Sequence, residues 1–137
     1  MNIIVTLSNN NGMLFNKRRQ SRDGILINRM FELIGDKKLN INGFSWQMLG
    51  NRKENINLSE DFLKNAKSGD FCFVENKNLK DCEDKIEKIY VFQWNRDYPA
   101  DFFFDIDLGS GKWKNTYVEE FAGSSHENIT LLIYERI

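Results

Sequence analysis

Three short apolar segments constrain the fold of this chain more than any other feature of its sequence. Asn2–Ser8 (NIIVTLS) is rich in β-branched residues, Phe71–Val74 (FCFV) is apolar throughout, and Ile89–Trp94 (IYVFQW) is almost so. A short run without polar alternation is typical of a strand that is buried on both faces, as at the centre of a parallel sheet. We therefore expect these segments to be buried strands, the last two of them central in a sheet.

Helical patterns separate the expected strands. Apolar residues recur at helical spacing between Ser21, a good N-cap, and Gly35, a good C-terminal stop. The other expected elements, in chain order, are a strand at Lys38–Ile41, a helical turn capped by Ser45 and ending at Gly50, a strand at Asn55–Leu58, a short helix at Ser59–Ala66 capped by Ser59, and weak helical spacing at Leu79–Ile86.

The end of the chain predicts an antiparallel hairpin, formed by Thr116–Phe121 and Ile129–Ile137 around a polar turn. Strands that alternate with helices and then close in a hairpin indicate an α/β fold. We expect a single, mainly parallel sheet with flanking helices and a C-terminal antiparallel hairpin.

Composition narrows the functional classes. The 137 residues are 41% hydrophobic, enough for one core, so we expect a single domain over residues 1–137. The 19 Lys and Arg against 20 Asp and Glu give no global basic field, which leaves only weak support for nucleic-acid binding. The apolar runs are far shorter than the roughly 20 residues of a membrane span, and no signal-peptide core is present. With two cysteines, Cys72 and Cys82, outside a C-x-x-C pair, we expect a cytoplasmic protein that does not bind membranes.

A basic segment is the main candidate for function. Four cations lie in the loop Gly12–Asp23: Lys17, Arg18, Arg19 and Arg22. Cations at a helix N-terminus oppose the helix dipole by a few tenths of a kcal/mol, so stability alone does not favour them there. Free backbone N–H groups flanked by guanidinium groups would suit a phosphate or an acidic partner surface. The alternative is a solvated stretch balanced by Asp23 and Glu32.

Other polar residues carry weaker signals. His126, the single histidine, falls in the expected hairpin turn, and no second type of metal ligand clusters near it. Asp101, Asp105 and Asp107 lack the spacing and the closing glutamate of a calcium loop. We expect no metal site.

Several segments together resemble dihydrofolate reductase over nearly the whole chain. Asp84–Trp94 (DKIEKIYVFQW) is similar to a helix end and strand of that family, Asp101–Asp105 (DFFFD) to its "D-x-x-F-P" turn, and Lys112–Ile137 to its final hairpin. Lys37–Gly50 (KKLNINGFSWQMLG) resembles "K-P-V-I-M-G-R-x-T-W-E-S-I-G", and Glu54–Ser59 (ENINLS) resembles the strand after it. The resemblance implies a dihydrofolate-reductase-like α/β fold.

The resemblance fails at positions that it would assign to the nicotinamide cofactor. The family has a Gly-Gly pair after the strand equivalent to Phe71–Val74, where the backbone closely approaches the cofactor pyrophosphate; here those positions are Val74 and Glu75. A carboxylate there would repel a phosphate. The family's "G-R-x-T" motif reads Asn42–Ser45 here, so the arginine that contacts the cofactor phosphate is missing.

The substrate side of the resemblance also departs from the family. Gly12 and Phe15 lie where the family's loop has Gly and Trp, but both loop prolines are gone. Asp23 is the only acid near the start of the long helix, where the family's acid binds pterin and assists proton delivery. If the helix is aligned without gaps, Leu26 takes the place of that acid.

Two main hypotheses follow. The first is a non-reductase binding or regulatory protein, without a cofactor, that uses the segment 12–23 with Phe15 to bind an anionic small molecule or an acidic protein surface. Such a small, nearly neutral domain would suit an accessory or inhibitory protein of a phage or mobile element. The alternative is an NADPH-dependent reductase of dihydrofolate or a related pterin, with Asp23 as the acid and the cofactor held by Ser45, Arg52 and Ser59. Nucleic-acid binding through the basic loop is a third reading, and would weaken steeply with salt.

Overall fold

The computed structural model describes residues 1–52 and 55–137. The strands are β1 (Asn2–Leu7), β2 (Gly12–Phe15), β3 (Arg18–Arg19), β4 (Leu39–Ile41), β5 (Ile56–Leu58), β6 (Phe71–Phe73), β7 (Lys88–Gln93), β8 (Phe102–Phe103), β9 (Trp113–Phe121) and β10 (Ile129–Arg136). The helices are α1 (Gly24–Ile34), α2 (Gly43–Leu49), α3 (Phe62–Asn65) and a 3₁₀ segment at Lys80–Lys85. Glu54, the first residue of the segment ENINLS, lies outside the described residues.

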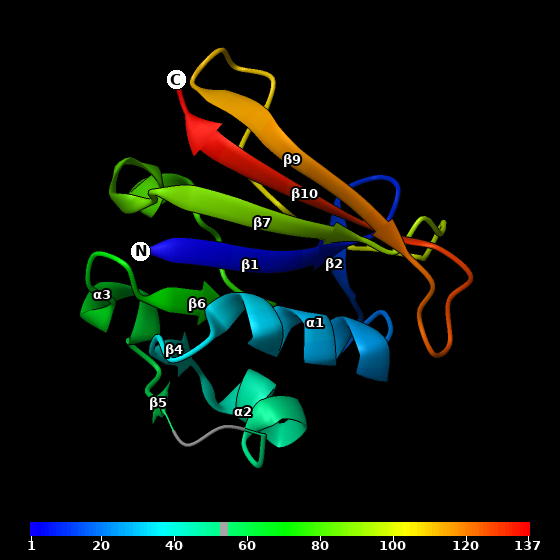
Figure 1. The fold of residues 1–137 in the computed structure, drawn as a ribbon, viewed down its shortest axis with the longest axis horizontal. Coiled ribbons are helices and arrows are strands. Elements are labelled where there is room, and N and C mark those ends of the chain that lie inside the picture. Colours follow the sequence, from blue (N-terminus) through cyan, green and yellow to red (C-terminus); the bar gives the residue numbers. More distant parts are fainter. Residues whose placement is uncertain (53–54) are drawn as a thin grey trace.

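The main sheet has the expected parallel centre and antiparallel end. Over the described residues its strand order is β5-β4-β6-β1-β7-β10-β9 (Figure 1). All pairs from β5 to β7 are parallel, whereas β10 pairs antiparallel with both β7 and β9. The three apolar runs form β6, β1 and β7, side by side at the centre. The predicted α/β architecture is therefore confirmed.

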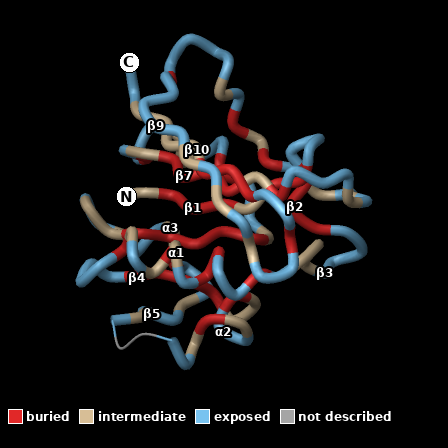
Figure 2. The backbone as a smooth tube through the Cα atoms, turned by 45° about the vertical axis from the view of Figure 1, so that its right-hand side comes forward, coloured by how far each residue is buried: buried red, intermediate tan, exposed pale blue. Residues whose placement is uncertain are grey.

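Side chains that alternate along the central strands build a core on each face of the sheet. In β1, Ile3 and Val5 belong to one apolar cluster and Ile4 belongs to the other. The Ile4 cluster receives α1, whose Leu26, Ile27, Met30 and Ile34 are buried against it. The opposite cluster is covered by α3 and by the segment before β9. Figure 2 shows this buried centre in red, with exposed backbone around β3. Within the described residues, no helix is long and apolar enough to cross a membrane.

The N-caps of the first two helices differ from the predicted ones. Asp23, not Ser21, caps α1, since its carboxylate accepts the N–H groups of Ile25 and Leu26. Asn42, not Ser45, caps α2. Both serines direct their hydroxyls to distant partners, described below. Serine, aspartate and asparagine are all good caps, so local propensity does not choose between them.

The third helix is also shorter than predicted. It begins at Phe62, three residues after the expected cap. Ser59 instead accepts the backbone N–H of Asp61 and the side-chain amide of Asn65, so it stabilises the turn that leads into the helix. At the end of α1, Gly35 has φ +59°, the left-handed region that glycine adopts most easily, as predicted for the helix stop.

The segment predicted as a loop is instead a β-hairpin. In the described chain, β3, β2 and β8 form a separate three-stranded antiparallel sheet. Gly12 begins β2 where a Cβ would lie only 2.5 Å from Ala100 Cβ and Ser8 Oγ. The turn of the hairpin holds Asn16 at φ 51° and Lys17 at φ 61°.

Candidate functional site

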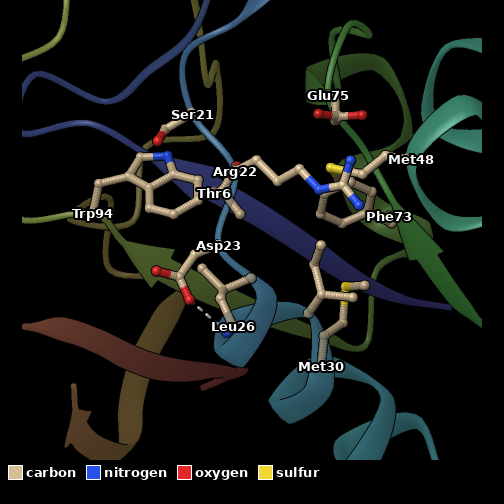
Figure 3. Close-up of a pocket in the computed structure, with 11 residues that line it drawn as sticks. Thr6, Ser21, Arg22, Asp23, Leu26, Met30, Met48, Phe73, Glu75 and Trp94 are labelled. Carbon is tan, nitrogen blue, oxygen red and sulfur yellow. Dashed lines mark hydrogen bonds between the residues drawn. The ribbon is translucent and has the colours of Figure 1, made fainter. Parts of the chain in front are cut away.

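A small cavity lies at the carboxyl ends of the central strands, where open α/β sheets usually bind ligands. Its lining consists of Thr6, Ser21, Arg22, Asp23, Leu26, Ile27, Met30, Met48, Phe73, Glu75 and Trp94. Figure 3 shows the Arg22 side chain lying across it, with its guanidinium group toward Phe73 and Glu75. The free space is about 10 Å³, room for roughly one water molecule. Bulky side chains therefore fill nearly all of the cavity in this conformation.

Asp23 is an anchor at one end of the cavity. Its buried carboxylate caps α1 and also accepts the backbone N–H groups of Ser124 (3.1 Å) and Ser125 (2.9 Å). Burial opposes the charged form, but these N–H groups, the His126 side chain and the Leu26 N–H outweigh it and hold the pKa of Asp23 well below its usual range. Asp23 is therefore ionised at neutral pH and holds no proton to donate.

His126 lies buried beside Asp23 rather than in an open turn. Its Nδ1 is 3.0 Å from Asp23 Oδ2. Its Nε2 is 3.0 Å from Ser21 Oγ and 2.9 Å from the Tyr98 hydroxyl. The imidazole stacks on the indole of Trp94, with ring centroids 4.5 Å apart. The side chains of three distant segments thus meet around one histidine.

Glu75, which is buried, and Arg19, which is partly exposed, form an ion pair on the opposite side of the cavity. Arg19 donates from Nε and Nη2 to the two carboxylate oxygens of Glu75, at 2.9 and 3.0 Å. The Ser45 hydroxyl donates to the same carboxylate at 2.8 Å. Arg19 also donates to the Phe44 carbonyl and lies over the Phe44 ring, 4.6 Å from its centroid. The Glu75 carboxylate is therefore neutralised by a cation of the basic segment.

The tip of the β2–β3 hairpin carries two exposed cations of that segment. Lys17 and Arg18 are exposed, and Phe15 beside them is 49% exposed. Within the residues that the structure describes, Lys17, Arg18 and Arg22 make no ion pair. Open depressions of about 310 and 550 Å³ flank the hairpin; Arg18 and Phe15 line the first and Lys17 lines the second.

The structure thus divides the predicted anion site into three parts. Arg19 is paired internally, Arg22 covers the cavity, and Lys17 and Arg18 lie at the hairpin tip with Phe15. The helix N-terminus is not open to an anion, because Asp23 and the Ser124 hydroxyl occupy the first N–H groups of α1.

The residues assigned to a cofactor under the reductase alternative are engaged within the protein. Ser45 is buried on Glu75. Arg52 donates to the Asn28 side chain and lies 5.9 Å from the Phe31 ring centroid. Ser59 stabilises the turn before α3. Among the described residues, no group of three or more His, Cys, Asp or Glu side chains is arranged to hold a metal ion.

Sequence reasoning missed the roles of His126, Tyr98 and Trp94. His126 is 103 residues from Asp23 along the chain, so no local spacing signals their contact. The available signal was chemical: a lone histidine in a chain that also places a tryptophan at the carboxyl end of a central strand.

Of the comparisons with known proteins, the one with solved structures identifies the fold. No protein-family model matches the chain, and no curated protein matches it. Among solved structures, it is similar to dihydrofolate reductase from Enterococcus faecalis in complex with NADP(H) and RAB-propyl, with a TM-score of 0.69 and 12% identity, over 98% of this chain and 95% of that one. The chain therefore has a dihydrofolate-reductase-like fold, as the motifs of its sequence predicted.

Proposed function

We propose that this chain is a non-reductase binding protein on a dihydrofolate-reductase-like scaffold, and that its β2–β3 hairpin binds an acidic protein surface or another anionic ligand. The observation that carries the proposal is the Arg19–Glu75 ion pair. It sets an internal carboxylate and its cation at the end of β6, where the resemblance places the pyrophosphate of a reductase cofactor.

The Glu75 carboxylate opposes cofactor binding in two ways. Its charge would repel a phosphate, and its bulk replaces the backbone surface that a glycine would expose. Arg19 could contact a phosphate only after leaving a carboxylate whose side chain is 5% exposed, which would strand a buried charge. With Arg22 lying across it, the cavity beside this pair has about 10 Å³ of free space, too little for a pterin ring. These features together support binding of something other than NADPH.

The hairpin supports anion binding through the cost of its turn. Lys17 has φ 61°, where glycine is preferred and where other residues lose about 1 kcal/mol. A turn selected only for stability would place glycine or asparagine there. Lys17 and Arg18, without ion pairs in the described chain, are free to meet carboxylates, and the Phe15 ring adds apolar contact area.

A titration with a defined acidic probe tests this proposal. A fluorescent peptide with several Glu and Asp residues and one aromatic residue would be titrated against the wild-type chain and two double variants of equal net charge. Lys17→Glu/Arg18→Glu should weaken binding about tenfold, since each of the two lost contacts between opposite charges contributes up to about 1 kcal/mol at an exposed site and tenfold corresponds to about 1.4 kcal/mol. Lys64→Glu/Lys67→Glu, on exposed lysines around α3, should leave it unchanged.

The same preparation should show no thermal stabilisation by NADPH. A ligand at about 100 times its Kd stabilises a native protein by roughly 2.7 kcal/mol. Equal weakening by both double variants would mean nonspecific attraction and would remove the hairpin from the proposal. Stabilisation by NADPH would favour the reductase alternative.

A further inference from the structure

Ser21, His126 and Asp23 are arranged as a nucleophile, a general base and an orienting carboxylate. Ser21 Oγ lies 3.0 Å from His126 Nε2, and His126 Nδ1 lies 3.0 Å from Asp23 Oδ2. Both distances fall within the hydrogen-bonding range found in serine hydrolases of unrelated folds. Such a set is defined by geometry and roles rather than by chain order, so its residues need not be close in sequence.

The surroundings fix the state of the histidine that this chemistry requires. Asp23 is an ionised acceptor, so Nδ1 of His126 carries the proton that lies between them. In the neutral imidazole, Nε2 is then the acceptor, and the hydroxyls of both Ser21 and Tyr98 lie within hydrogen-bonding distance of it. Stacking on Trp94 and contact with the Tyr98 hydroxyl hold the ring in this orientation.

Ser21 lines the cavity, and a small acyl group can reach its hydroxyl once the Arg22 side chain moves aside, because the free space is about 10 Å³ with Arg22 in place. The Ser21 side chain is partly exposed, whereas His126 and Asp23 are buried. In the described chain, no hydrogen bond engages the backbone N–H of Arg22, the residue after Ser21, which leaves this group available to an oxyanion. The Arg22 side chain is exposed and without an ion pair there, so it can move aside and pair with an anionic substituent.

We propose that Ser21 is the nucleophile of an acyl-transfer site that hydrolyses small esters bearing a negative charge, with His126 as general base and Asp23 as the positioning residue. The site goes beyond the proposed binding function, because it uses Arg22 and the cavity rather than Lys17 and Arg18 at the hairpin tip.

The reaction balances without a cofactor. Ser21 Oγ forms a bond to the carbonyl carbon while its proton passes to His126 Nε2. The bond from carbon to the leaving oxygen then breaks, and that oxygen takes the proton from Nε2. Water attacks the acyl-serine, gives a proton to Nε2, and the acid leaves as Ser21 regains that proton.

The competing explanation is a purely structural latch that ties the β9–β10 connection to the start of α1. The two explanations differ in the reactivity of Ser21. A latch needs only hydrogen bonds, whereas a nucleophile requires a serine that reacts with an electrophile faster than other serines of the chain.

The test uses the full-length protein and a fluorophosphonate probe, with the labelled residue located by peptide mass spectrometry. Ser21 should be labelled in the wild-type chain. His126→Gln should slow labelling at least about 100-fold, the usual scale of general-base catalysis. Ser110→Ala, on an exposed serine far from the cavity residues in sequence, should leave the rate unchanged. Labelling spread over exposed serines, or none at Ser21 in folded protein, would overturn the proposal.

A nitrophenyl hemisuccinate supplies the turnover assay. The wild-type chain should hydrolyse it and Ser21→Ala should not. Asp23→Asn should lower kcat while leaving KM unchanged, with kcat expressed per site that the fluorophosphonate titrates, so that a loss of folded protein does not count as a loss of kcat. If Ser21→Ala fails to fold, Ser21→Cys replaces it: the new thiol should react with iodoacetamide faster than Cys82, and His126→Gln should abolish that difference. Equal hydrolysis by wild type and Ser21→Ala, or equal thiol rates, would leave only the latch.

Discussion

Replacing Glu75 by glutamine should destabilise the protein substantially, although the two side chains have nearly the same shape. The carboxylate accepts three hydrogen bonds, two from Arg19 and one from Ser45. The side-chain oxygen of glutamine can still accept from Arg19 Nη2 and Ser45 Oγ. Its NH₂ group, however, would replace the oxygen that accepts from Arg19 Nε, so that two N–H donors would face each other. The variant therefore loses the negative charge and places two hydrogen-bond donors against each other.

The magnitude follows from burial. Removing one partner of a fully buried ion pair costs about 3–5 kcal/mol. The Arg19 side chain is 24% exposed and recovers part of its hydration, so we expect a loss of about 2–3 kcal/mol. For a domain of this size, that corresponds to a fall in Tm of roughly 10 °C.

Urea unfolding of five proteins measures this loss and shows whether it comes from the ion pair. They are the wild type, Glu75→Gln, Arg19→Met and the double variant, with Glu127→Gln as an exposed control that should change the free energy of unfolding by less than about 0.5 kcal/mol. The double variant should cost much less than the sum of the two single changes, because either change alone breaks the same pair. A loss below about 0.5 kcal/mol for Glu75→Gln, or additive losses, would refute the reasoning.

Three further predictions concern Asp23 and the hairpin turn. The pKa of Asp23 lies well below 3.8 in the folded chain, so its contribution to stability is complete above about pH 5 and is lost as the pH falls through 3.8 toward the folded-state pKa. Thermal melts should therefore show Tm falling with pH in this acid range for the wild type, and falling less steeply for Asp23→Asn. Gly123→Ala should cost about 1–3 kcal/mol in urea unfolding, because a Cβ there would lie 2.3 Å from Asp23 Oδ2, whereas Gly109→Ala, whose nearest such contact is 3.4 Å away, should cost far less. Lys17→Gly should raise stability by about 1 kcal/mol by removing the left-handed strain, while it weakens binding of the acidic peptide; a loss of stability would contradict this reading of the turn.

The sequence predicted the main sheet well because its signals are local. Each apolar run, such as Phe71–Val74, is long enough to define a buried strand, and the closing hairpin has two clear arms around a polar turn. The predicted α1 cap, Ser21, is wrong because Ser21 and Asp23 are equally suitable by local propensity. Contacts with residues 124 to 126, about 100 positions away, decide between them.

The candidate site was only half predictable for the same reason. Glu75 stood out as a carboxylate at a position where the resemblance requires glycine, but its partner Arg19 lies 56 residues earlier. The sequence predicts a loop where the β2–β3 hairpin lies, because the turn at Asn16–Lys17 lacks the glycine that usually marks a two-residue turn. Functional pressure on a turn residue would remove the very signal that sequence reasoning uses.

Calorimetric titration of the wild-type chain with NADPH, with an active dihydrofolate reductase as the positive control, tests the central claim most directly. We expect no binding heat at NADPH concentrations that saturate the reductase, because the Glu75–Arg19 pair occupies the end of β6. Saturable NADPH binding, with or without oxidation by a pterin substrate, would contradict the account and would establish an altered mode of cofactor binding.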